Sequence, residues 1–182
     1  MPSHVQRNIA NSNFAWALTS NVLGVLTEVI KPDHLMNPWP EVVRFRNCMV
    51  IMILIGLGIR SRELLNLRIH DLDFKHRKAV IRCGNERLLL LLMPEHLATI
   101  MREYIAIDRQ KYPGSKEHDF LLVSSKDGYP LSPSAFKHIF TAVRRNVPGI
   151  PADFNARYCR HTAAALQDYY RSIVNPIFLT KI

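Results

Sequence analysis

The most informative segment of this chain reads Gly58-Ile59-Arg60-Ser61-Arg62-Glu63-Leu64-Leu65-Asn66-Leu67. It directly follows Met49 to Leu57, a run that is apolar on all sides, as a central core helix is. Gly58 can supply the left-handed backbone that ends such a helix, so a second helix is predicted just after it. Arg60 then falls at the junction of two helices, where the scaffold would hold its side chain. Taken alone, this position favours an ordinary solvated arginine at a helix start.

A second basic segment, Arg157-Tyr158-Cys159-Arg160-His161-Thr162, lies far along the chain. If a helix includes Arg157, then Arg157, Arg160 and His161 share one of its faces. Guanidinium groups are planar, bidentate donors that match phosphate geometry. Together with Arg60 they would hold an oxyanion from two sides, as a phosphoryl-transfer transition state requires. The alternative for this segment alone is a basic, solvated helix face.

The composition predicts one folded domain with an anionic partner. The chain has 182 residues, of which 48% are hydrophobic, enough for a single core. Lys and Arg number 24 against 15 Asp and Glu, giving a net charge of +9. Such an excess suits nucleic acid most often and a membrane surface sometimes, and the alternative is a merely basic soluble protein.

The cysteines indicate neither a disulfide framework nor a metal site. Cys48, Cys83 and Cys159 are far apart and lack zinc-ligand spacing, which predicts reduced thiols in an intracellular compartment. The apolar run from Cys48 to Gly58 is too short to span a bilayer. We therefore expect a soluble, cytoplasmic protein with no membrane partner.

Hydrophobic periodicity and turn residues predict the elements of the first half. A helix is expected from near Phe14 to Ile30, capped by Asn11-Ser12-Asn13, and another from Glu41 to Leu57. The region from Asp71 to Met93 alternates and predicts a small antiparallel sheet of two or three strands. Within it, Leu88 to Leu92 could instead be helical, because a uniform run has no period.

The second half is predicted to be mainly helical. We expect a helix from Leu97 to Ile105, a short strand from Phe120 to Val123, a helix from Ser132 to Arg145 and a helix from Cys159 to Arg171. The predicted fold class is α+β, mainly α, with a small antiparallel sheet. Residues 1–36 are expected to form a helical lead-in and residues 37–182 the domain itself.

At this point the motifs resemble those of a known family. The segment Gly58 to Leu67, with the acids that follow it, resembles the first arginine box of the tyrosine recombinases, the phage integrase family. Arg160-His161-Thr162-Ala163 resembles their second box, commonly His-x-x-Arg-His-Thr, and Ser124 to Ser132 resembles the segment between the boxes. The resemblance covers Asn37 to Leu166 and implies a helical recombinase catalytic domain, here a partial one.

The resemblance implies a chemistry as well as a fold. In that family a tyrosine attacks a DNA phosphate to give a 3′-phosphotyrosyl link and a free 5′-hydroxyl, without metal or nucleotide. Arg60 and Arg160 would bind the scissile phosphate of double-stranded DNA, His161 would support the second box, and Glu63 would buttress the fold or orient Arg60. The resemblance also implies a protein that has no cofactor and is associated with DNA in the nucleoid. Family members act as synaptic tetramers, so a homo-oligomer on DNA is an open expectation.

The sequence also departs from the family pattern near the expected site. Arg157 stands where the second box usually has its first histidine, and arginine is a poor proton shuttle. The family's lysine belongs on the turn near Gly84 to Arg87, which has none. Lys78 is an imperfect substitute on the preceding strand, whereas Arg87 could supply charge but not readily a proton.

The nucleophile is the largest departure. The family's third box, a Gly-His pair, and its tyrosine belong well beyond the second box, and no Gly-His follows His161. Tyr169 and Tyr170 follow that box too closely, so packing roles are expected for them. We expect a truncated recombinase domain whose enzymatic activity is an open question. The alternatives are a non-catalytic DNA-binding module derived from a recombinase, or a basic scaffold or RNA-binding protein with chance motif matches.

Overall fold

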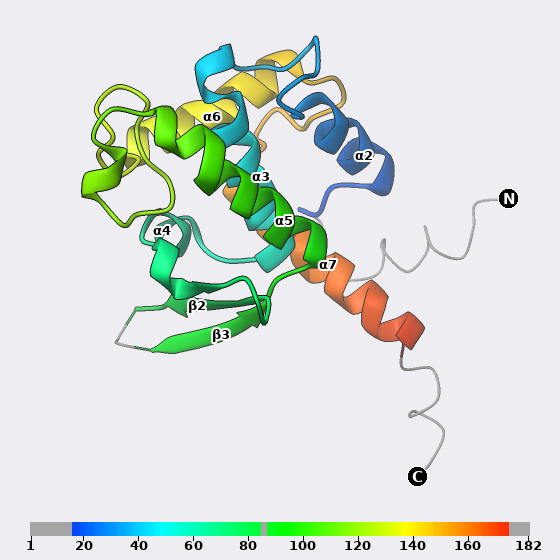
Figure 1. Cartoon of the computed structure of the whole chain (residues 1–182). Helices are drawn as coiled ribbons and strands as arrows, with labels where there is room; N and C mark the ends of the chain where they lie inside the picture. Colours follow the sequence, from blue (N-terminus) through cyan, green and yellow to red (C-terminus); the bar gives the residue numbers. More distant parts are fainter. Residues whose placement is uncertain (1–15, 85–86, 175–182) are drawn as a thin grey trace, which may run out of the picture.

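The fold is built around α3 (Arg44–Leu57), as the computed structural model shows for residues 16–84 and 87–174. Figure 1 shows this helix in the middle of the molecule, with α5 (Glu95–Glu103), α6 (Pro133–Asn146) and α7 (Ala156–Val174) around it. Most of α3 is buried, since its apolar residues face neighbours on all sides. The predicted central core helix is therefore present, preceded by a 3-10 turn, Glu41–Val43, rather than by continuous α-helix.

The N-terminal helix begins later than its periodicity suggests. α2 spans Ser20–Val29, and the side chain of Thr19 accepts a hydrogen bond from the Val22 N–H. Residues 16–19 are not helical, while the predicted cap at residues 11–13 and the start near Phe14 lie outside the described residues. Leu26 and Ile30 are fully buried in the same core as α3. The division at residue 36 stays a prediction.

The small antiparallel sheet is present and has three strands in the order β1-β2-β3. They are β1 (Leu72–Asp73), β2 (Lys78–Arg82) and β3 (Leu88–Leu92). The run of leucines is therefore a strand, because pairing with β2 supplies its backbone hydrogen bonds. Ala79 and Ile81 are fully buried on the inner face.

The predicted strand at Phe120 to Val123 is wrong. This segment makes only isolated bridges, Arg68 to Phe120 and Val123 to Pro130. The buried Arg109 guanidinium donates two hydrogen bonds to the Phe120 carbonyl oxygen, from Nε at 3.1 Å and from Nη2 at 2.9 Å. A side chain thus satisfies a group that a strand ladder would otherwise use.

The last two long helices position the second basic segment. α6 begins as predicted, because the Ser132 side chain accepts from the Ala135 N–H at 3.1 Å. α7 begins at Ala156, earlier than the predicted Cys159, because Asn155 Oδ1 accepts from the Arg157 N–H at 2.8 Å. Arg157 is consequently helical. The predicted mainly α architecture with a small antiparallel sheet is confirmed. Among the described residues, no helix combines the length and apolar character needed to cross a membrane.

Candidate phosphate-binding site

Arg60 lies in extended backbone immediately before α4 (Ser61–Leu65), with φ −77° and ψ 155°. Its N–H donates to Glu63 Oε2 at 2.7 Å, which fixes the start of the helix from its first turn. The Arg60 side chain is exposed. Glu63 therefore orients the backbone at Arg60, and the guanidinium stays free to meet a ligand.

Gly58 brings the end of α3 into close contact with α7. Its backbone is left-handed, with φ +64°, and its N–H donates to the Leu54 carbonyl at 3.0 Å. A Cβ added at Gly58 would lie 3.2 Å from Ala163 Cβ. Glycine is needed here for both its conformation and its size. This packing places Arg60 next to the outward face of α7.

The inward face of α7 is anchored by Thr162, which is buried. Its Oγ1 accepts from the Leu18 N–H at 2.9 Å and donates to the Tyr158 carbonyl at 2.8 Å. With this face held, Arg157 and Arg160 are exposed and His161 is half-buried on the outer side.

The four predicted site residues meet at a single cavity. Its volume is about 520 Å³, and its lining residues are Ile59, Arg60, Ser61, Ala156, Arg157, Arg160, His161 and Ala164. None of these described residues is acidic, so the guanidinium groups here have no lining carboxylate to offset them. Like charges held together in this way favour an anion between them.

Arg157 is also held by an aromatic contact. Its guanidinium carbon lies 5.9 Å from the centroid of the Trp16 ring, within cation–π range. Trp16 in turn packs edge-on against Tyr158, with ring centroids 5.3 Å apart. The segment before α2 thereby orients a charged group of the site, a contact that the sequence did not predict.

The β2–β3 turn contributes a further cation. Arg87 lines an adjoining cavity of about 560 Å³ together with Arg60 and Arg160. Lys78 instead lies at the opposite end of β2, paired with Leu92, and does not line this cavity. Of these two candidates, Arg87 and not Lys78 lines a cavity with Arg60.

Cys83 lies in the same region. It lines that adjoining cavity with Arg60 and Arg87. Desolvation and the neighbouring Glu63 raise the pKa of its thiol, although Arg87 and Arg60 oppose the shift. The thiol is therefore mainly protonated near neutral pH, which makes it a poor nucleophile.

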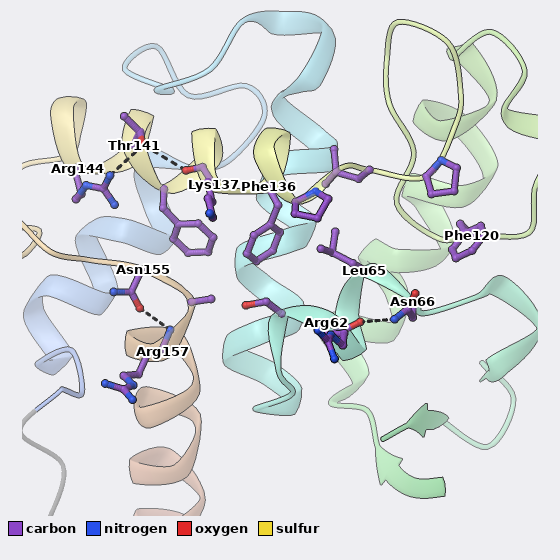
Figure 2. Close-up of a pocket in the computed structure, with 16 residues that line it drawn as sticks. Arg62, Leu65, Asn66, Phe120, Phe136, Lys137, Thr141, Arg144, Asn155 and Arg157 are labelled. Atoms are coloured by element: carbon purple, nitrogen blue, oxygen red, sulfur yellow. Dashed lines mark hydrogen bonds between the residues drawn. The ribbon is translucent and has the colours of Figure 1, made fainter. Parts of the chain in front are cut away.

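A larger, mainly apolar cavity of about 930 Å³ adjoins the site on the side of α6. Figure 2 shows Phe136, Lys137, Thr141 and Arg144 of α6 facing Arg62 and Arg157 across it. Arg157 lines both this cavity and the one that holds the predicted site residues, so the two cavities adjoin.

Tyr169 and Tyr170 lie on α7, beyond the second basic segment. Tyr169 is 45% exposed on α7 and is not among the residues lining the Arg60–Arg160 cavities. The side chain of Tyr170 lies outside the described residues.

Comparison with known proteins decides the family. The model of the phage integrase family matches residues 28–182. The chain belongs to the phage integrase family. It is 26% identical over 131 residues to transposase A from transposon Tn554 of Staphylococcus aureus, covering 65% of this chain and 35% of that protein. It is 27% identical over 128 residues to tyrosine recombinase XerH of Helicobacter pylori, covering 68% of this chain and 34% of that protein. The chain thus spans about a third of the length of these relatives.

Solved structures of recombinases share the fold. The XerH site-specific recombinase bound to difH substrate, in a pre-cleavage complex, gives a TM-score of 0.69 at 23% identity, over 88% of this chain and 45% of that chain. XerA recombinase gives 0.67 at 20% identity, over 93% of this chain and 59% of that chain. These similarities confirm the predicted recombinase catalytic-domain architecture.

Proposed function

We propose that this chain is part of a tyrosine-type site-specific recombinase or integrase, and that it binds a backbone phosphate of double-stranded DNA between α4 and α7. Arg60 and Arg160 bind the phosphate oxygens, while Arg157 adds charge and His161 supports the pair. The observation that carries the proposal is the convergence of all four side chains on one cavity without a lining carboxylate.

The arrangement suits a phosphate whose oxygens gain negative charge during phosphoryl transfer. The guanidinium groups reach the phosphate from α4 and α7, which both pack on α3. They therefore need little reorganisation as charge develops on the phosphate oxygens. Arg157 cannot exchange a proton near neutral pH, because its guanidinium stays charged. In this proposal its function is therefore electrostatic.

We further propose that neither Tyr169 nor Tyr170 is the nucleophile. Tyr169 follows Arg160 along α7 and does not line the cavity where the phosphate would lie. In this chain α4 and α7 would supply phosphate binding, and a tyrosine from another part of the recombinase would supply the attack. Assembly of copies on DNA, in the nucleoid, belongs to the same proposal.

The second candidate is a non-catalytic DNA-binding module that keeps the phosphate site. The observation that favours it is Arg157, which retains positive charge where the family pattern has a proton-transferring histidine. Both candidates predict DNA binding, and only the first predicts a covalent adduct.

Binding of a fluorescent DNA duplex tests what the candidates share. Arg60→Ala and Arg160→Ala should each weaken binding by about tenfold, or roughly 1.4 kcal/mol, as for a charged hydrogen bond. Arg145→Ala is the matched control, because Arg145 is exposed in the last turn of α6 and does not line the cavity. Equal effects of all three changes would contradict the proposed site.

Nicked duplexes separate the candidates. With a duplex that carries the recombination site and traps the cleaved state, the first candidate predicts an adduct that survives denaturant when this chain acts together with the part of the recombinase that supplies the tyrosine. If an adduct forms, its loss in Tyr169→Phe or Tyr170→Phe would overturn our assignment of these tyrosines. DNA binding without an adduct would favour the module.

A further inference from the structure

A second arginine-rich cavity lies on another side of Arg60. It has a volume of about 420 Å³, and its lining residues are Arg60, Arg62, Glu63, Asn66, Arg68, Arg82, Cys83, Gly84 and Phe120. Four of these are arginines and one is an acid, and the carboxylate of that acid, Glu63, accepts from the Arg60 N–H. Asp71 offsets one further arginine, Arg82, and the cavity keeps an excess of positive charge before any ligand binds.

Arg68 is oriented by its neighbours. Its guanidinium carbon lies 4.4 Å from the centroid of the Phe120 ring, and its backbone N–H donates to Asp71 Oδ2 at 3.1 Å. Stacking uses the flat face of a guanidinium and leaves the N–H donors at its edge for an oxyanion.

Arg82 is fixed by the same acid. Its Nη2 donates to Asp71 Oδ1 at 2.6 Å, and the Asp71 side chain is only 3% exposed. Asp71 thus holds Arg82 through one oxygen and the backbone of Arg68 through the other. Groups that are fixed in advance lose little entropy when a ligand arrives.

Arg62 completes the cavity from the end of α4. Asn66 Nδ2 donates to the Arg62 carbonyl at 2.9 Å, and the Arg62 side chain is exposed. Figure 2 shows Arg62 and Asn66 together where this helix ends, with Phe120 on the neighbouring loop. The exposed guanidinium can approach a ligand that Arg68 and Arg82 also contact.

We propose that this cavity is a second phosphate subsite, which binds the DNA phosphate next to the one held by Arg60 and Arg160. The inference rests on the proposed function. Arg60 lines both cavities, so the two anion positions share one residue. A DNA strand offers successive phosphates on one backbone, whereas a free inorganic phosphate would fill one cavity and leave the other charged.

The salt dependence of DNA binding tests the subsite. The duplex affinity of the full chain is measured from about 50 to 200 mM salt, where each phosphate contact makes the negative slope of log K against log salt steeper by about 0.9. Arg62→Gln with Arg68→Gln should make that slope shallower by about one and weaken binding about tenfold near 100 mM salt. Arg82 is left unchanged, because its removal would leave the buried Asp71 unpaired. Arg145→Gln is the control.

The outcomes separate this inference from the proposed function. If Arg160→Gln weakens binding but the Arg62/Arg68 variant behaves like Arg145→Gln, only the second subsite is overturned. If the unaltered chain shows no salt-dependent DNA binding, the proposed function fails as well. If phosphate raises the melting temperature more than chloride at equal ionic strength, through Arg62 and Arg68, while the DNA slope is unchanged, the cavity binds free phosphate and the inference is wrong.

Discussion

Individual residues of the site could be predicted from sequence only where they belong to a recognisable motif. Arg60 and Arg160 belong to recognisable boxes, and the structure brings both to one cavity. Arg68 and Arg82 could not be identified in this way, because their relation depends on Asp71, which contacts both in the folded chain. Short sequence patterns do not encode such a shared buried partner.

Thr162 gives the sharpest stability prediction for a single side chain. Thr162→Val removes the acceptor of the Leu18 N–H, which would be left buried and unpaired, so the free energy of unfolding should fall by about 1–3 kcal/mol. Urea denaturation measures this. The control is Thr99→Val, since Thr99 is exposed and donates only to the Glu95 carbonyl within α5, and its cost should stay below about 0.5 kcal/mol. Equal costs would contradict the anchoring role of Thr162.

Among the elements, long periodic helices were predicted better than their ends. The core helix α3 is where its apolar run indicates. In contrast, α2 begins late, at Ser20, and α7 begins early, at Ala156, because each start depends on the side chain of the residue before it, Thr19 or Asn155. The predicted strand at Phe120 does not form, because the Arg109 side chain binds the Phe120 carbonyl oxygen. Alternation within residues 120–123 does not reveal a contact with a residue outside that segment.

Substitutions at two glycines test the close packing of α3 against α7, one at the contact and one away from it. Gly58→Ala should cost about 1–2 kcal/mol for the left-handed backbone, with a further cost from the Ala163 contact, and should weaken DNA binding by displacing α7. Gly24→Ala, in α2 with nothing within 4 Å of the added Cβ, should stabilise the chain by about 0.5–1 kcal/mol. Urea midpoints and duplex affinity measure both. A Gly58→Ala chain as stable as the unaltered one would refute the close-packing account.

The edge strand β3 makes a separate prediction about solubility. Leu88, Leu90 and Leu92 are 60%, 59% and 74% exposed on an edge of the sheet, an arrangement that promotes association between chains. Leu90→Lys should reduce aggregation, seen by light scattering, with little loss of stability. Ile81→Lys, which places a charge in the core, should unfold the chain. Unchanged aggregation in Leu90→Lys would show that this edge is not responsible.

At the scale of the whole molecule, one core joins segments from Leu18 to Cys159, and it buries the thiols of Cys48 and Cys159 in their neutral forms. Burial raises the pKa of the Cys48 thiol to about 12, from a model-compound value of 9.0. It also raises the pKa of Cys159. The unfolded chain ionises these thiols first, so their contribution to stability is present below pH 9.0 and is lost as the pH rises toward 12.

The corresponding prediction concerns alkaline stability. The free energy of unfolding should fall with increasing pH above about 9, where the unfolded thiols lose their protons. Cys48→Ala should show a shallower fall, although its stability at pH 7 is lower because of the cavity it leaves. Urea titrations at several pH values measure the slope. The same slope in both chains would contradict the assignment to Cys48.

The central claim is that Arg60 and Arg160 bind the same phosphate, and a double-mutant cycle on duplex affinity tests it most directly. Arg60→Ala, Arg160→Ala and the double variant are compared at one salt concentration, with the fold of each checked by circular dichroism. We expect a coupling free energy of about 1 kcal/mol or more, because either change already disrupts the shared site. Effects that add within about 0.3–0.5 kcal/mol would show that the two arginines act at separate places on the DNA, and would contradict the account.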